Sequence, residues 1–155
     1  MSKSLSRVKA ALATAGLDVV VHDMPAATRT AAEAAAAAGV SLNQIVKSIL
    51  FQGESGKLYL FLTAGGNQVD PAAAAALAGE PLARADANAV RQITGFAIGG
   101  VAPIGHLTAL PIWLDPVLLQ FPVVWAAAGT PNHIFPINPE TLLYLTGADE
   151  AAFTA

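Results

Sequence analysis

The 155-residue sequence contains no cysteine, and this absence excludes disulfide bonds, thiolate zinc sites and a cysteine nucleophile. It also lacks an unbroken apolar stretch of about 20 residues, so we expect no membrane span. The charges within residues 1–9 have helical spacing and no long apolar segment follows them, so we expect no signal peptide. These absences predict a cytoplasmic protein that does not act at a membrane.

Positive charge is also scarce, with 8 Lys and Arg against 11 Asp and Glu and a net charge of −3. Proteins that bind long stretches of nucleic acid are usually basic, so this chain is expected to contact at most one or two phosphates at a strand end. No P-loop, G-x-G-x-x-G or G-x-S-x-G motif occurs. His22, His106 and His133 are not spaced as metal ligands, so we expect neither a cofactor nor a metal.

The apolar pattern predicts short helices and strands within one domain. Helical spacing or capping residues predict helices at 4–15, 31–38, 70–78, 86–93 and 138–145. Apolar and β-branched runs predict strands at 19–21, 45–51, 57–63, 96–98, 111–115, 123–128 and, at an edge, 134–137. No repeat, linker or charge block divides these elements, so we predict one domain over residues 1–155. The irregular order of helices and strands predicts an α/β (α+β) fold with a mixed, barrel-like β-sheet flanked by helices.

Lys47 lies in the middle of the otherwise apolar strand 45–51. Because side chains alternate along a strand, Lys47 shares a face with Ile45 and Ile49. A lysine between two isoleucines is costly unless its ammonium group reaches water or an anion. Two interpretations stay open: a functional cation in a pocket, or an edge-strand lysine whose head extends to solvent.

A glycine-rich loop follows the predicted strand 96–98, with the sequence Gly99, Gly100, Val101, Ala102 and Pro103. Two glycines allow positive φ or a close approach of a ligand, and the proline stiffens the loop. Such a loop can direct several backbone amides at one oxyanion. The alternative is a tight connection between strands.

Other candidate residues carry weaker signals. Thr28 and Arg29 precede a helix N-terminus, where a phosphate could bind, although a plain capped helix explains them equally. Asp115 ends a strand and is either a turn residue or a group that faces the Gly99 loop. His133, in the loop 129–133, is a candidate for proton transfer or an ordinary surface histidine.

Taken in order, these segments resemble the YbaK family, which is related to the editing domain inserted in bacterial prolyl-tRNA synthetases. The strings that carry the resemblance are residues 29–35, 44–51, 69–70, 94–105, 114–115 and 128–129. The resemblance spans residues 28 to 146. It implies a mixed, barrel-like sheet and hydrolysis of the ester that joins a wrong amino acid to the terminal adenosine of tRNA, most often tRNA for proline.

The resemblance also implies roles for particular residues. The strand lysine of the family falls on Lys47 and its glycine-to-proline loop on 99–103, and both are tied to activity. Asn67 stands where many relatives carry an aspartate, and Thr130, next to Gly129, stands where many carry a histidine. We therefore expect the substrate-binding residues to include Asn67 and Gly129, without assigning one amino acid. The expected partners are the aminoacylated 3′ end of tRNA and an aminoacyl-tRNA synthetase that supplements a modest tRNA affinity.

Three functions are compatible with these residues. The first is trans-editing of mischarged tRNA by a deacylase. The second is a module that binds a tRNA end, a nucleotide or a synthetase without turnover. The third is a hydrolase of another small acyl ester, which would act on simple aminoacyl esters without tRNA.

Overall fold

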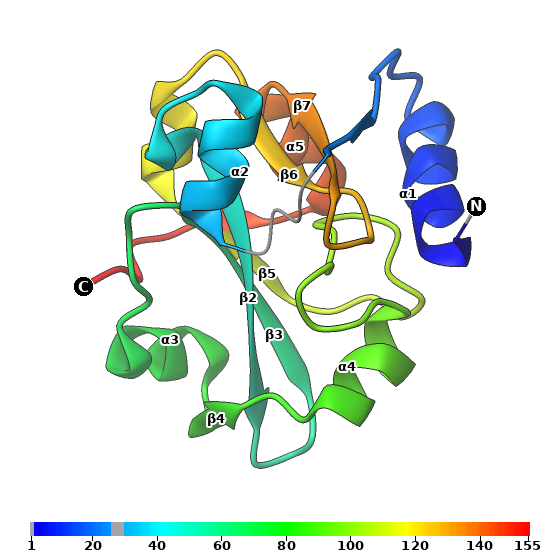
Figure 1. Ribbon diagram of the computed structural model, residues 1–155. Helices are drawn as coiled ribbons and strands as arrows, with labels where there is room; N and C mark the ends of the chain where they lie inside the picture. The colour runs from blue at the N-terminus through cyan, green and yellow to red at the C-terminus, as the bar shows by residue number, and fades with distance from the viewer. Residues whose placement is uncertain (1, 26–29) are drawn as a thin grey trace.

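The computed structural model describes residues 2–25 and 30–155 (Figure 1). Its helices are α1 (Lys3–Thr14), α2 (Ala31–Ala38), α3 (Pro71–Ala78), α4 (Ala87–Thr94) and α5 (Pro139–Thr146), with 3-10 turns η1 (Leu42–Gln44) and η2 (Pro116–Gln120). Its strands are β1 (His22–Asp23), β2 (Ile45–Gly53), β3 (Leu58–Ala64), β4 (Leu82–Arg84), β5 (Ile112–Leu114), β6 (Val124–Ala127), β7 (His133–Ile137) and β8 (Asp149–Glu150). No helix in this part of the chain has the length and apolar character needed to cross a membrane.

The helices begin where capping residues predict. Thr30 and Glu33 form the expected capping box at α2, in which each side chain accepts a hydrogen bond from the other residue's amide. Asp70, Asp86 and Asn138 cap α3, α4 and α5 by accepting amide hydrogens of the first helical turn. Local sequence therefore sets these helix starts.

The strands form one mixed sheet in the order β1-β7-β6-β2-β3-β5-β8, and β4 also pairs with β2. The predicted hairpin is confirmed, because β2 and β3 pair antiparallel from Val46–Ala64 to Gln52–Leu58. The β2–β6, β3–β5 and β5–β8 pairs are parallel, and the other pairs are antiparallel. Helices flank this sheet (Figure 1), so the predicted mixed sheet with flanking helices is confirmed.

Two predicted strands are wrong. Residues 96–98 form no strand, because Gly95 ends α4 in the left-handed region and the Thr94 hydroxyl accepts the Phe96 amide at 3.0 Å. Residues 19–21 form none either, and the short strand β1 lies just beyond them. The strand expected at an edge, residues 134–137, corresponds to β7, which lies between β1 and β6. Strand β1 covers only the first part of β7, so Pro136 has a strand neighbour in β6 alone and its other side is an edge.

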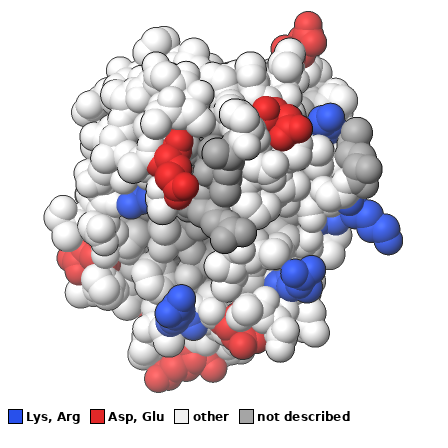
Figure 2. Space-filling model, in the orientation of Figure 1, with Lys and Arg blue, Asp and Glu red and all other residues white. Residues whose placement is uncertain are grey.

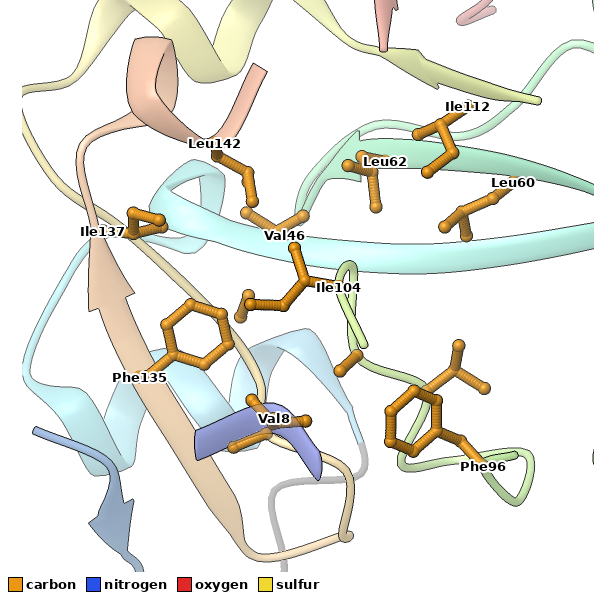
Figure 3. Packing of buried hydrophobic residues seen from close by; sticks show 14 of the residues in the cluster. Val8, Val46, Leu60, Leu62, Phe96, Ile104, Ile112, Phe135, Ile137 and Leu142 are labelled. Carbon is orange, nitrogen blue, oxygen red and sulfur yellow. The ribbon is translucent and has the colours of Figure 1, made fainter. Parts of the chain in front are cut away.

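The main hydrophobic core covers one face of the β2–β3 hairpin. Val46, Leu60 and Leu62 point from that face into a cluster that includes Phe96 and Ile104 (Figure 3). Each fully buried leucine or phenylalanine contributes about 1.5–3 kcal/mol relative to an exposed position. This packing holds the segment that follows α4 against the sheet.

Candidate functional site

A cavity of about 410 Å³ opens beside β2, at a gap in the sheet. On this side of β2, β6 pairs with Ile45 and Val46, and β4 pairs with the residues from Phe51 to Gly53. Residues 47–50 pair with β3 on one edge of β2, but on the other edge no described strand lies beside them. The described residues lining the cavity are Thr30, Ala31, Ala34, Ile45, Val46, Lys47, Ser48, Ile49, Gly65, Gly99, Val101, Trp125, Ala126, Ala127 and Ile134.

Lys47 supplies the cationic group among the described residues that line this cavity. Its side chain is partly buried, and its Nζ donates a hydrogen bond of 2.5 Å to the backbone oxygen of Asn67. Burial lowers the pKa of the Lys47 ammonium group below its usual value, and the nearby Asp115 carboxylate partly opposes this shift. One hydrogen-bond acceptor leaves two N–H groups of Lys47 available for a substrate.

Asp115 interacts with the charge of Lys47, does not line the cavity and is 1% exposed. Its carboxylate accepts hydrogen bonds from the Ala64 amide at 3.1 Å, the Asn67 side chain at 2.9 Å and the Val117 amide at 3.0 Å. These bonds make Asp115 the cap of η2 and fix the loop that carries Asn67. Asp115 and Asn67 thus position Lys47 from outside the cavity wall.

The Gly99–Pro103 loop contributes only part of its length to the cavity. Gly99, at φ +95°, and Val101 line it. The Gly100 amide donates to the Ala97 oxygen at 3.1 Å, so it is already used within the loop. Ala102 is buried and its carbonyl lies 2.7 Å from Nε2 of His106, and Pro103 lines a separate hollow beside His106.

Arg7 of α1 holds both ends of the segment that contains this loop. Its guanidinium donates to the Gly95 oxygen at 2.5 Å and to the Gly105 oxygen at 3.2 Å. It also lies 4.8 Å from the centre of the Phe96 ring. Sequence analysis missed Arg7, because these partners are 88 and 98 residues away and no local pattern signals such contacts.

His106 lies near both the Arg7 guanidinium and the loop. Burial lowers its pKa; the hydrogen bond to the Ala102 carbonyl opposes this shift, and the Arg7 charge adds to it. A neutral His106 can donate Nε2–H to that carbonyl. The imidazole therefore supports the loop at Ala102, which does not line the cavity.

The remaining predicted site residues lie elsewhere. Gly129 packs against the Ser4 backbone and the Phe96 ring, and it does not line the cavity. His133 contacts the Thr130 hydroxyl at 2.5 Å and lies 3.6 Å from the Asp23 carboxylate, also outside the cavity lining. Thr28 and Arg29 are outside the described residues.

Most of the cavity wall consists of apolar side chains, and the sequence alone did not identify these residues as part of a site. Trp125 and Ile134 come from β6 and β7, and Ala31 and Ala34 come from α2. On the face seen in Figure 2, Lys and Arg lie as separate points among Asp and Glu, without a continuous basic area over the described residues. No cluster of three or more potential metal ligands occurs in the described ranges. Among the described residues, the cavity thus combines apolar walls, the ammonium group of Lys47 and part of the glycine loop.

The chain matches the aminoacyl-tRNA editing domain over residues 25–145. The uncharacterized protein YwhH of Bacillus subtilis (strain 168) is 32% identical over 122 residues, which cover 79% of this chain and 78% of YwhH.

Two solved structures share the whole architecture. The structure of a proposed trans-editing enzyme for prolyl-tRNA synthetase is 51% identical, with a TM-score of 0.93 and coverage of 100% of this chain and 99% of that one. The hypothetical protein APE2540 is 32% identical, with a TM-score of 0.88 and coverage of 96% and 99%. The family match includes β2, the glycine loop and β6, which together build the cavity, and the chain belongs to the aminoacyl-tRNA editing domain family.

Proposed function

We propose that this protein is a trans-editing deacylase that hydrolyses the ester between a wrong amino acid and the terminal ribose of tRNA. The observation that carries the proposal is the cavity itself, in which Lys47 lies together with Gly99 and Val101 of the glycine loop. A cation and backbone amides around one apolar space suit an ester whose carbonyl oxygen becomes negatively charged during attack.

The reaction needs no protein nucleophile. Water adds to the ester carbonyl carbon and forms a tetrahedral oxyanion. The bond from that carbon to the ribose oxygen then breaks, and the ribose oxygen takes up one of the two protons of the water and becomes a hydroxyl. The second proton leaves the new carboxyl group for solvent, which gives the free amino acid carboxylate. The vicinal ribose hydroxyl of the substrate can orient the water, and the cavity provides the surroundings that hold both in place.

The loop and Lys47 have separate roles in this proposal. The amides of Gly99 and Val101 have no acceptor among the described residues, so they are available to the oxyanion, whereas the Gly100 amide is not. Each such donor is typically worth a factor of about 10²–10³ in rate. Lys47, held by the Asn67 carbonyl, directs its two remaining N–H groups at the carbonyl region or the terminal phosphate.

The substrate class follows from the relatives and from charge. One structural neighbour is described as a proposed trans-editing enzyme for prolyl-tRNA synthetase, so we propose tRNA for proline as the carrier. The net charge of −3 favours modest tRNA affinity, which a synthetase partner would supplement.

The test is deacylation of proline tRNA charged with a panel of non-cognate amino acids. Lys47→Ala should abolish turnover, and Lys57→Ala, at an exposed lysine of the β2–β3 hairpin turn, is the matched control that should keep it. Turnover of the tRNA esters that is lost only in Lys47→Ala supports the proposal. Binding of charged tRNA without any turnover would instead establish a non-catalytic module. Equal activity on simple aminoacyl esters would establish a general esterase.

A further inference from the structure

In strand β2, the backbone N–H and C=O of Ser48 are directed at the cavity and are not paired with another described strand. The neighbouring strand β3 has β2 on one side and β5 on the other. The Leu60 amide donates to the Pro111 oxygen at 3.0 Å, and the Asp115 amide donates to the Leu62 oxygen at 2.9 Å. Leu60 and Leu62 therefore direct their backbone groups toward β5 and away from β2.

The antiparallel register carries this alternation into β2. Leu62 is opposite Ser48, so Lys47 and Ile49 bond to β3 while Ser48 directs its N–H and C=O to the opposite edge. Odd-numbered residues of β2 thus direct their backbone groups toward β3. Gly53 agrees with this alternation, because its amide donates to the Lys57 oxygen at 2.9 Å. The opposite edge at Ser48 is the gap between β6 and β4.

Ser48 is therefore unpaired in both main-chain groups within the described part of the chain. The β6 pairing ends at Val46, the β4 pairing begins at Phe51, and no hydrogen bond reaches the Ser48 N–H or C=O from a described residue. Its hydroxyl oxygen is buried and also has no partner there. Ser48 lines the same cavity as Lys47, Gly99 and Val101.

We propose that Ser48 is the residue on which the aminoacyl group docks, an inference that rests on the proposed function and deepens it. The Ser48 N–H donates to the ester carbonyl oxygen, and the Ser48 C=O accepts from the α-ammonium group. An aminoacyl ester carries one donor on the α-nitrogen and one acceptor on the carbonyl, as a strand residue does. The amino acid thus binds as one residue added to the free edge of β2, by exchange of two hydrogen bonds.

This docking brings the reacting atoms to the other groups of the site. The carbonyl oxygen then lies at the strand edge, inside the cavity that Gly99 and Val101 also line. The Ser48 amide thereby joins the loop amides as an oxyanion donor, and it does so without any movement of β2. The mode also makes the α-ammonium group a requirement for tight binding, whatever the amino acid side chain.

The test uses two analogues that the protein cannot hydrolyse as esters: 3′-(L-alanylamino)-3′-deoxyadenosine and its propionyl counterpart, which lacks only the α-amino group. NMR of isotope-labelled protein follows the Ser48 amide, with the Ile49 amide as the matched control because it faces β3. The alanyl analogue should shift the Ser48 amide and protect it from hydrogen exchange, and leave the protection of Ile49 unchanged. The propionyl analogue should bind about ten-fold or more weakly, since it loses a hydrogen bond from a charged donor.

Equal binding of the two analogues, or shifts confined to the loop amides with Ser48 unchanged, would overturn the inference. So would failure of the alanyl analogue to bind. Because the analogues report binding and not turnover, the two proposals fail differently. Protection of Ser48 in a protein that deacylates no tRNA would support the docking mode and overturn the proposed deacylase. Deacylation of tRNA without protection of the Ser48 amide would support the proposed deacylase and overturn the docking mode.

Discussion

Replacement of Gly100 by alanine tests how tightly the glycine loop packs. A Cβ atom at this position would lie 3.0 Å from Cα, 3.1 Å from C and 3.2 Å from N of Thr130. These are backbone atoms, so no side-chain rotation can relieve the contact. Gly100 does not line the cavity, so the methyl group would push the loop and residue 130 apart and would not enter the space for the acyl group.

The magnitude follows from the cost of inserting one methyl group into a packed contact, about 1–3 kcal/mol of unfolding free energy. For a chain of this length, each kcal/mol lowers Tm by about 2–4 °C. Deacylation should fall as well, because Gly99 and Val101 lie on either side of the displaced residue. Thermal unfolding by circular dichroism gives the stability, and single-turnover deacylation gives the activity.

Two comparisons make this prediction refutable. Gly100→Ala should lower the unfolding free energy by the same amount in the wild-type protein and in a Thr130→Ala background, because the clash is with backbone atoms. A full rescue of Gly100→Ala by Thr130→Ala would refute the reasoning. A substitution at Gly99 would be strained for a different reason, because the backbone there has a φ of +95° and the space around it is open. Asparagine, which tolerates positive φ, should therefore be accepted better than alanine at Gly99 and worse than alanine at Gly100.

Three further predictions concern the groups around the cavity. Arg7→Ala should cost about 1–3 kcal/mol and reduce deacylation, because the loop segment loses its hydrogen bonds at both ends, whereas Lys9→Ala on the exposed side of α1 should change the unfolding free energy by less than about 0.5 kcal/mol; equal unfolding midpoints in urea would contradict this. Asp115→Asn should cost about 1–3 kcal/mol, since one of its three donors would then face an amide N–H, and a neutral effect on Tm would show that the buried carboxylate is unimportant. Because the pKa of Lys47 is lowered, the unfolded chain holds this proton to higher pH than the folded protein; stability relative to Lys47→Met should therefore rise as pH increases from the folded pKa toward 10.5, and a fall measured by urea titration would contradict the sign.

Local signals predicted much of the fold. The Thr30 capping box and the Asp70, Asp86 and Asn138 caps set helix starts, and each depends on contacts within a few residues. The β2–β3 hairpin was predictable for the same reason. The strand expected at 96–98 was wrong because β-forming residue types there are overridden by a local hydrogen bond to the Thr94 hydroxyl.

The sequence predicted only those parts of the site in which a residue type is unusual for its own segment. Lys47 stood out as a charge in an apolar strand, and the glycine loop stood out by composition. Arg7 and the unpaired edge at Ser48 could not be found this way, because both depend on which distant elements lie alongside. Gly100 and Gly129 have packing contacts where a ligand contact was expected, since a sequence does not distinguish the two uses of glycine.

The central claim is that Lys47 acts on the substrate inside this cavity and does not hold the fold together. The most direct measurement is the single-turnover rate of deacylation of the best mischarged tRNA by the wild-type protein and by Lys47→Met, with Tm recorded for both. We predict a rate lower by a factor of about 10²–10³ at a nearly unchanged Tm. A rate within two-fold of the wild type, or a loss of rate that follows the loss of folded protein, would contradict the account.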